Sequence, residues 1–188
     1  MQINKPILVV VTIVSALLGM WLGFKLVRDV PMGIALPIIL LLFIGFGIFI
    51  WKMLSNNVSA KPASAAADAD AKSLRSSAEK ARIYIYRQKA FMGMAQGMDV
   101  AITGLKTGQL KGSNFVMAEV DPGTYTVTGN MAAFPNKKGE LQLMLSPGEV
   151  AIVEASMQAD LTTGSVNVKR VDSGGHESIR SGQLIDWA

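Results

Sequence analysis

Two uninterrupted apolar runs at the start of the chain, Ile7–Phe24 and Gly33–Trp51, limit its fold more than any other feature. Neither run contains a charged residue. A helix of this length is roughly 27–29 Å long, which is close to the thickness of the hydrocarbon layer of a bilayer. The pattern predicts two transmembrane helices, at about residues 7–24 and 33–51, in a helical hairpin that occupies residues 1–54.

The first run carries three small residues, Ser15, Gly19 and Gly23, at a spacing of four. Such a stripe lets another helix approach closely, so these are candidate helix-packing residues. The partner is either the second span or a subunit of a larger complex. Trp21 and Trp51 lie where aromatic side chains are expected at membrane interfaces. A signal peptide is the alternative interpretation of the first run, but no suitable small-residue cleavage site follows it, and we expect it to be retained.

The rest of the chain has a different pattern. Residues 55–80 are rich in Ala and Ser and predict a solvent-exposed helical stalk, with a flexible tether as the alternative. Residues 81–171 alternate apolar and polar positions between Gly- and Pro-containing turns, which predicts an antiparallel β-sandwich of about seven or eight strands. Residues 172–188 form a Gly- and Ser-rich tail whose end is expected to dock on this domain. The expected fold class is a membrane α-helical hairpin plus an all-β domain.

Four motifs in the β-rich region carry a family resemblance: Ala81–Arg87, Phe91–Gly93, Val120–Tyr125 and Leu145–Glu149. Over about Ala81–Met157 the chain resembles an uncharacterised bacterial envelope family, domain-of-unknown-function family 2846. The resemblance implies a β-sandwich like the carboxypeptidase-regulatory-like domains, with no known catalysis and no site residues. Many members look like lipoproteins or exported proteins, but this chain lacks the cysteine that a lipoprotein signal requires.

Residues capable of catalysis are few. The chain has no cysteine, which excludes disulfides, thiol nucleophiles and cysteine-ligated metals, and its one histidine excludes any site that needs two imidazoles. Asp172, Ser173 and His176 contain the side chains of a catalytic triad, but three residues of one Gly-rich loop cannot easily take the mutual orientation of a triad. The sequence therefore predicts a protein that is not an enzyme, with no catalytic, cofactor-binding or metal-binding residues.

The net charge of +4 is small and dispersed, so we expect no nucleic-acid partner. The apolar residues Phe91, Met92 and Met94 form a candidate protein-contact patch. We expect a non-enzymatic, membrane-anchored accessory or scaffold subunit of a bacterial membrane protein complex, in which the sandwich is a protein-binding module. The alternative function is a membrane-tethered envelope module that binds a glycan or a lipid.

The expected partners follow from the hairpin: the lipid bilayer, and either other membrane protein subunits or further copies of the chain. The expected location is the bacterial inner membrane, with two spans. The side on which the sandwich lies stays open, because the distribution of positive charge favours the cytoplasm and the family resemblance favours the periplasm.

Overall fold

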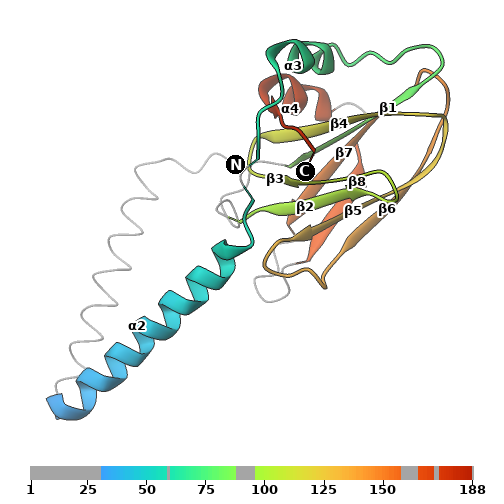
Figure 1. Ribbon diagram of the computed structural model, residues 1–188. Coiled ribbons are helices and arrows are strands. Elements are labelled where there is room, and N and C mark those ends of the chain that lie inside the picture. Colours follow the sequence, from blue (N-terminus) through green and yellow to red (C-terminus); the bar gives the residue numbers. More distant parts are fainter. Residues whose placement is uncertain (1–30, 59, 88–95, 158–164, 172–173, 188) are drawn as a thin grey trace. The chain divides into compact units, whose positions relative to one another are not determined.

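A computed structural model describes residues 31–58, 60–87, 96–157, 165–171 and 174–187 (Figure 1). The chain divides into two compact units, Met1–Ile50 and Trp51–Ala188. Helix α2 (Met32–Ser55) contains nearly all the described residues of the first unit. The second unit contains the two β-sheets and two short helices, and it carries the candidate site.

No helix within the described ranges is both long enough and apolar enough to cross a membrane. The prediction of two transmembrane helices in a bacterial inner membrane is therefore wrong. Helix α2 covers the run 33–51, and the run 7–24 lies outside the described residues. The physical reason is that an apolar run shows only that its side chains avoid water. It does not identify the surroundings that cover them.

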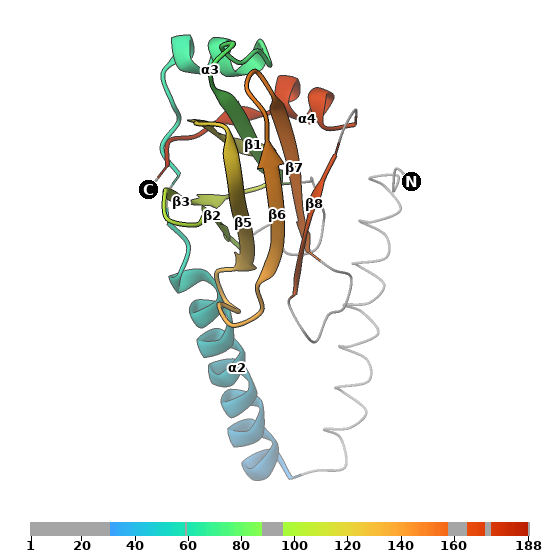
Figure 2. The same ribbon diagram turned by 90° about the vertical axis from the view of Figure 1, so that its right-hand side faces the viewer.

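The described part of the second unit contains nine strands in two sheets. Its elements are α3 (Ala65–Lys72), β1 (Ala81–Arg87), β2 (Met98–Ile102), β3 (Lys106–Leu110), β4 (Asn114–Val120), β5 (Gly123–Met131), β6 (Gly139–Leu145), β7 (Val150–Met157), β8 (Val166–Arg170), α4 (Gly175–Ser181) and β9 (Gln183–Leu184). One sheet has the order β8-β7-β1-β4-β9 and the other β3-β2-β5-β6. The two sheets form a sandwich, with α3 and α4 at the five-stranded sheet (Figure 2).

The strand pairing differs from the prediction of a purely antiparallel sandwich with seven or eight strands. Strand β1 pairs in parallel with β7, and β4 pairs in parallel with the short strand β9. In the described ranges, the other pairs of neighbouring strands are antiparallel. Alternation along a strand shows which residues share a face, but it does not show which strand lies beside it or in which direction. The sequence pattern was therefore insufficient to predict the parallel neighbours.

Strand β1 is buried on both faces. Ile83 and Ile85 point into the main core between the sheets and are fully buried. Tyr84 and Tyr86 point to the opposite face, where they form a second core with Phe115 and residues of α3 and α4. Isoleucine and tyrosine alternate along β1, so each face of the strand carries one of these residue types. Each face therefore packs in a core of its own.

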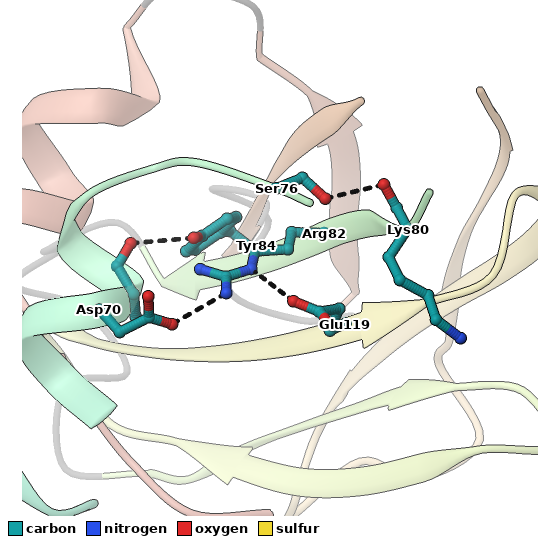
Figure 3. A network of polar contacts seen from close by, with 7 residues as sticks. Asp70, Ser76, Lys80, Arg82, Tyr84 and Glu119 are labelled. Carbon is teal, nitrogen blue, oxygen red and sulfur yellow. Dashed lines mark hydrogen bonds and ion pairs between the residues drawn. The ribbon is translucent and has the colours of Figure 1, made fainter. Parts of the chain in front are cut away.

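Helix α3 is attached to the sandwich, which differs from the exposed stalk expected for this segment. The Tyr84 hydroxyl donates a hydrogen bond to the Ala71 carbonyl oxygen at 2.9 Å. The Arg82 guanidinium contacts carboxylates of Asp70 on α3, at 2.9 Å, and of Glu119 on β4, at 3.0 Å (Figure 3). Ala71 is fully buried. Its side chain is small, so the helix backbone can lie directly against Tyr84.

Candidate functional site

The candidate site is a groove of about 650 Å³ over the outer face of strands β3, β2 and β5; we call it the Trp187 groove. Its floor consists of two rows of side chains that run across the three strands. In the first row Asp99 of β2 lies between Gln109 of β3 and Asn130 of β5. In the second row Ala101 of β2 lies between Thr107 of β3 and Thr128 of β5.

The first row is held in place by its own hydrogen bonds. The Asp99 carboxylate accepts from Gln109 Nε2 at 2.8 Å on one oxygen and from Asn130 Nδ2 at 3.2 Å on the other. Gln109 Nε2 also donates to the Asn56 carbonyl, while its Oε1 accepts from the Val58 N–H at 2.7 Å. Because every polar atom of the Gln109 side chain is engaged, this residue has a fixed orientation and binds the segment after α2 to the floor.

A side chain at position 97 would displace the side chain of Gln109. A Cβ atom at Gly97 would lie 2.2 Å from Gln109 Cδ. The Gly97 N–H instead donates to Asn57 Oδ1 at 2.7 Å. The backbone of Gly97 therefore lies close against the side chain of Gln109 and helps to fix its position.

The wall of the groove is built from two segments that are far apart in the sequence. The Asp186 N–H donates to the Lys61 carbonyl at 2.9 Å, and Pro62 and Ile185 form an isolated antiparallel bridge. Trp187 Nε1 donates to the Met117 carbonyl at 2.8 Å, which fixes the orientation of the indole ring. The wall is therefore formed by residues around Lys61 and by residues around Asp186, which lie beside the floor.

A carboxylate on α3 supports this wall. Asp68 Oδ1 accepts a hydrogen bond from the Leu184 N–H at 2.9 Å, and Oδ2 pairs with Lys72 at 2.7 Å. Burial pushes the pKa of the Asp68 carboxyl upward, but the bonds from Lys72 and Leu184 outweigh burial and hold the pKa below its usual value. Asp68 is therefore ionised at neutral pH and fixes the backbone just before the wall.

A second polar cluster lies under α4. The Tyr86 hydroxyl donates to Glu154 Oε2 at 2.8 Å, and Lys169 contacts Glu154 Oε1 at 3.2 Å. Burial, together with the neighbouring Glu154 carboxylate, raises the pKa of Tyr86 to about 12. A phenol that stays protonated at neutral pH acts here as a permanent donor to a buried carboxylate. The cluster therefore joins β1, β7 and β8.

Most residues singled out from the sequence fall outside the described part of the chain. These are the helix-packing residues Ser15, Gly19 and Gly23, the interface residue Trp21, the patch Phe91, Met92 and Met94, and the loop residues Asp172 and Ser173. Trp51 lies near the end of α2 and is 72% exposed. His176 lies on the surface of α4. In the described ranges, no three metal-ligating side chains lie close enough together to hold an ion.

Sequence reasoning missed the groove itself. Its floor residues are ordinary strand residues that alternate with buried ones, and their face is revealed only by the pairing of β2 with both β3 and β5. The one available signal is the aromatic residue Trp187 beside Asp186 in a polar tail, a pattern that predicts docking on the domain but not a groove.

Residues 77–168 match the family model described as "Protein of unknown function (DUF2846)". This match covers most of the sandwich, from before β1 into β8. The resemblance seen in the sequence is confirmed. The chain is also similar to a solved structure described as "NMR structure of the protein from Eubacterium rectale", with 15% identity and a TM-score of 0.33, over 51% of this chain and 92% of that one. No curated protein matches the chain.

The DUF2846 match includes the floor of the Trp187 groove and excludes its wall. Asp99, Ala101 and Thr128 lie within residues 77–168. Lys61 and Trp187, which border the same groove, lie outside that range. The DUF2846 segment therefore supplies the platform, and flanking segments of this chain convert the platform into a groove.

Proposed function

We propose that this chain is a non-enzymatic binding protein whose DUF2846 domain presents the Trp187 groove to a ligand. The observation that carries the proposal is the fixed floor row, in which Gln109 and Asn130 hold the Asp99 carboxylate. A carboxylate with an amide donor on each oxygen serves as an anchor for its neighbours and is poorly placed to remove a proton from a substrate. The groove also has the volume expected of a ligand site.

Thiol protection tests whether the groove is occupied, without knowledge of the ligand. The chain has no cysteine, so Thr128→Cys places a single thiol on the groove floor. We expect this thiol to react with a maleimide about tenfold more slowly in a native extract than in the purified chain, if about nine-tenths of the sites are occupied.

The control is Met144→Cys, on strand β6 and outside the groove, where the native side chain is 79% exposed. Its thiol should react at the same rate in both preparations. Equal rates for Thr128→Cys in the extract and in the purified chain, with a folded variant, would exclude a resident ligand in the groove and contradict the proposed function.

Helix α2 favours a second candidate function, that of an accessory subunit in a protein complex. Four successive residues, Ile38, Ile39, Leu40 and Leu41, are each at least 40% exposed. Successive helical residues point about 100° apart, so these four cover the whole circumference of the helix. A helix that is apolar all round needs apolar neighbours on more than one side, which supports association with several helices of partner subunits.

Glutamates at Leu40 and Leu41 test this association. We expect light scattering on the gently purified full chain to report an assembly, and the double variant Leu40→Glu/Leu41→Glu to shift it to a smaller mass. Met144→Glu is the matched control, because it adds a charge at an exposed site on β6. A wild-type chain that purifies as a uniform monomer with no second protein would count against the accessory role.

A further inference from the structure

We propose that the ligand of the Trp187 groove is an acidic peptide segment of a partner protein, which pairs as an extra strand with the free edge of β3. The inference rests on the proposed binding function and names its ligand class. Strand β3 is the outermost strand of its sheet, and among the described residues it pairs only with β2. An unpaired strand edge is a template on which another extended chain can form backbone hydrogen bonds.

The register of β2 shows which backbone groups of β3 are free. The Thr103 N–H, just after β2, donates to the Thr126 carbonyl at 2.9 Å, so the odd-numbered residues of β2 bond to β5. Backbone groups alternate in direction along an antiparallel strand, so the even-numbered residues of β2 bond to β3. Their partners are Lys106, Gly108 and Leu110. The N–H and C=O groups of Thr107 and Gln109 therefore point away from β2, toward the free edge.

This edge opens into the Trp187 groove. The lining of the groove includes three successive residues of β3, which are Thr107, Gly108 and Gln109. The wall beside them is paired with itself, through the bond from the Asp186 N–H to the Lys61 carbonyl. No backbone-to-backbone hydrogen bond in the described ranges joins the wall to β3. The edge of β3 therefore stays available to a strand that enters the groove.

Trp187 closes the core behind this edge. A Cβ atom at Gly108 would lie 3.2 Å from the indole Cε3 atom and 3.7 Å from a methyl group of Val116, on the inward face of β3. The indole Nε1 is bonded to the Met117 carbonyl of β4, in the other sheet. The indole therefore fills the gap between the two sheets at this side of the sandwich. An added strand has to satisfy backbone groups, but it does not have to cover the core.

Unpaired lysines around the edge favour an acidic strand. Lys106 begins β3 and Lys111 follows it, while two further lysines line the groove, Lys61 and Lys138. In the part of the chain that the structure describes, none of these four forms an ion pair. The carboxylates that line the groove are Asp99, which two amides already hold, and Asp186. Four lysines against two aspartates leave an excess of positive charge.

The same lysines disfavour a second copy of the chain as the added strand. Lysines at a sheet edge ordinarily prevent unwanted pairing, and β3 of another copy would bring two more of them to the same pair of strands. A peptide with carboxylates near both ends of its paired segment would meet Lys106 and Lys111 instead. These two lysines are about 17 Å apart along an extended chain, which corresponds to carboxylates about five residues apart.

An array of peptides of about ten residues tests the proposal on the purified full chain, with hits measured by titration calorimetry. The peptides have varied β-forming sequences with acidic, neutral or basic residues about five positions apart. We expect acidic peptides to bind and basic ones not to bind. Methylation of alternate amides in a hit gives two forms, of which one blocks the N–H groups that face β3. That form should bind about tenfold more weakly or worse, and the other form should bind like the unmodified peptide.

Variants of the protein separate backbone pairing from side-chain contacts. Thr107→Pro removes an N–H at the free edge, which edge strands tolerate, and should weaken binding by about tenfold or more. Thr107→Ala keeps this N–H and should leave the affinity unchanged. Lys106→Gln/Lys111→Gln should weaken the binding of acidic peptides by about tenfold. Arg75→Gln/Arg180→Gln, which removes the same charge from exposed sites outside the groove, should not weaken it.

The outcomes separate this inference from the proposed function. If Thr128→Cys is protected in the extract and no peptide binds, the peptide is wrong and the binding function stands. If acidic peptides bind equally to the wild type and to a folded Thr107→Pro variant, and both methylated forms bind alike, no strand pairs with β3 and the inference is overturned. A dimer of the wild-type chain that Thr107→Pro dissociates would assign the edge to a second copy and overturn it too. Unprotected Thr128→Cys with no peptide bound would overturn both.

Discussion

Replacement of Phe115 by alanine is expected to remove about 3–5 kcal/mol from the free energy of unfolding, the usual cost of deleting a buried phenylalanine ring. Phe115 on β4 is fully buried in the second core, with its ring centroid 6.3 Å from that of Tyr84. The same core contains Ile179 of α4 and Leu184 of β9. The cavity left by the ring would therefore weaken the attachment of the chain's end to the sheet as well as the sheet itself.

Urea unfolding of the full chain, followed by the circular dichroism of the sandwich, measures this effect. Small domains have about 5–15 kcal/mol of stability, so the loss is a large fraction of the total. Phe134→Ala is the control, because this side chain is 37% exposed and its truncation should cost less than about 1 kcal/mol. Equal costs for the two variants would contradict the assignment of Phe115 to a core.

The strands were largely predictable because their signals are local. Alternation and turn residues indicated β1, β5, β6, β7 and β8, and the turn at Asp121–Gly123 separates β4 from β5. The pairing was not predictable in the same way, since β1 has one neighbour that follows 27 residues later, at Asn114, and another that begins at Val150. Alternation cannot reveal that both faces of β1 carry a core.

The groove depends still more on contacts between distant residues. Its wall needs Asp186 beside Lys61, and the Leu184 N–H is bonded to a carboxylate 116 residues earlier, that of Asp68. Each of these residues, taken alone, is a typical surface residue in a polar segment. These residues form the wall only because the two segments come together at the edge of one sheet. No local sequence pattern predicts that contact.

Gly139 shows how a local interpretation can miss a residue's role. The segment Asn136–Gly139 has the composition of a turn, but Gly139 is the first residue of β6. It lies directly opposite Gly129 of β5, and both glycines face strand β8 of the other sheet. The missing side chains let the two sheets approach closely at this edge of the sandwich.

The second large effect is therefore expected for Gly139→Ala. Its Cβ would lie 2.1 Å from the backbone carbonyl oxygen of Val166, and a backbone atom cannot move aside as a side chain can. Strands β6 and β8 would have to separate, at a cost of about 3 kcal/mol. Urea unfolding of the full chain measures this cost.

Gly129→Ala is the matched control, because the closest contacts of its Cβ would be terminal methyl groups of Val166 and Val168, each at 3.1 Å, with the nearest backbone atom at 3.9 Å. Those methyl groups can shift by a few tenths of an ångström, and alanine also restricts the unfolded chain, so we expect a net change below about 1 kcal/mol. The comparison separates a backbone clash from side-chain crowding at one pair of opposite positions. If Gly139→Ala were as mild as Gly129→Ala, β6 and β8 could not lie as close together as they do here.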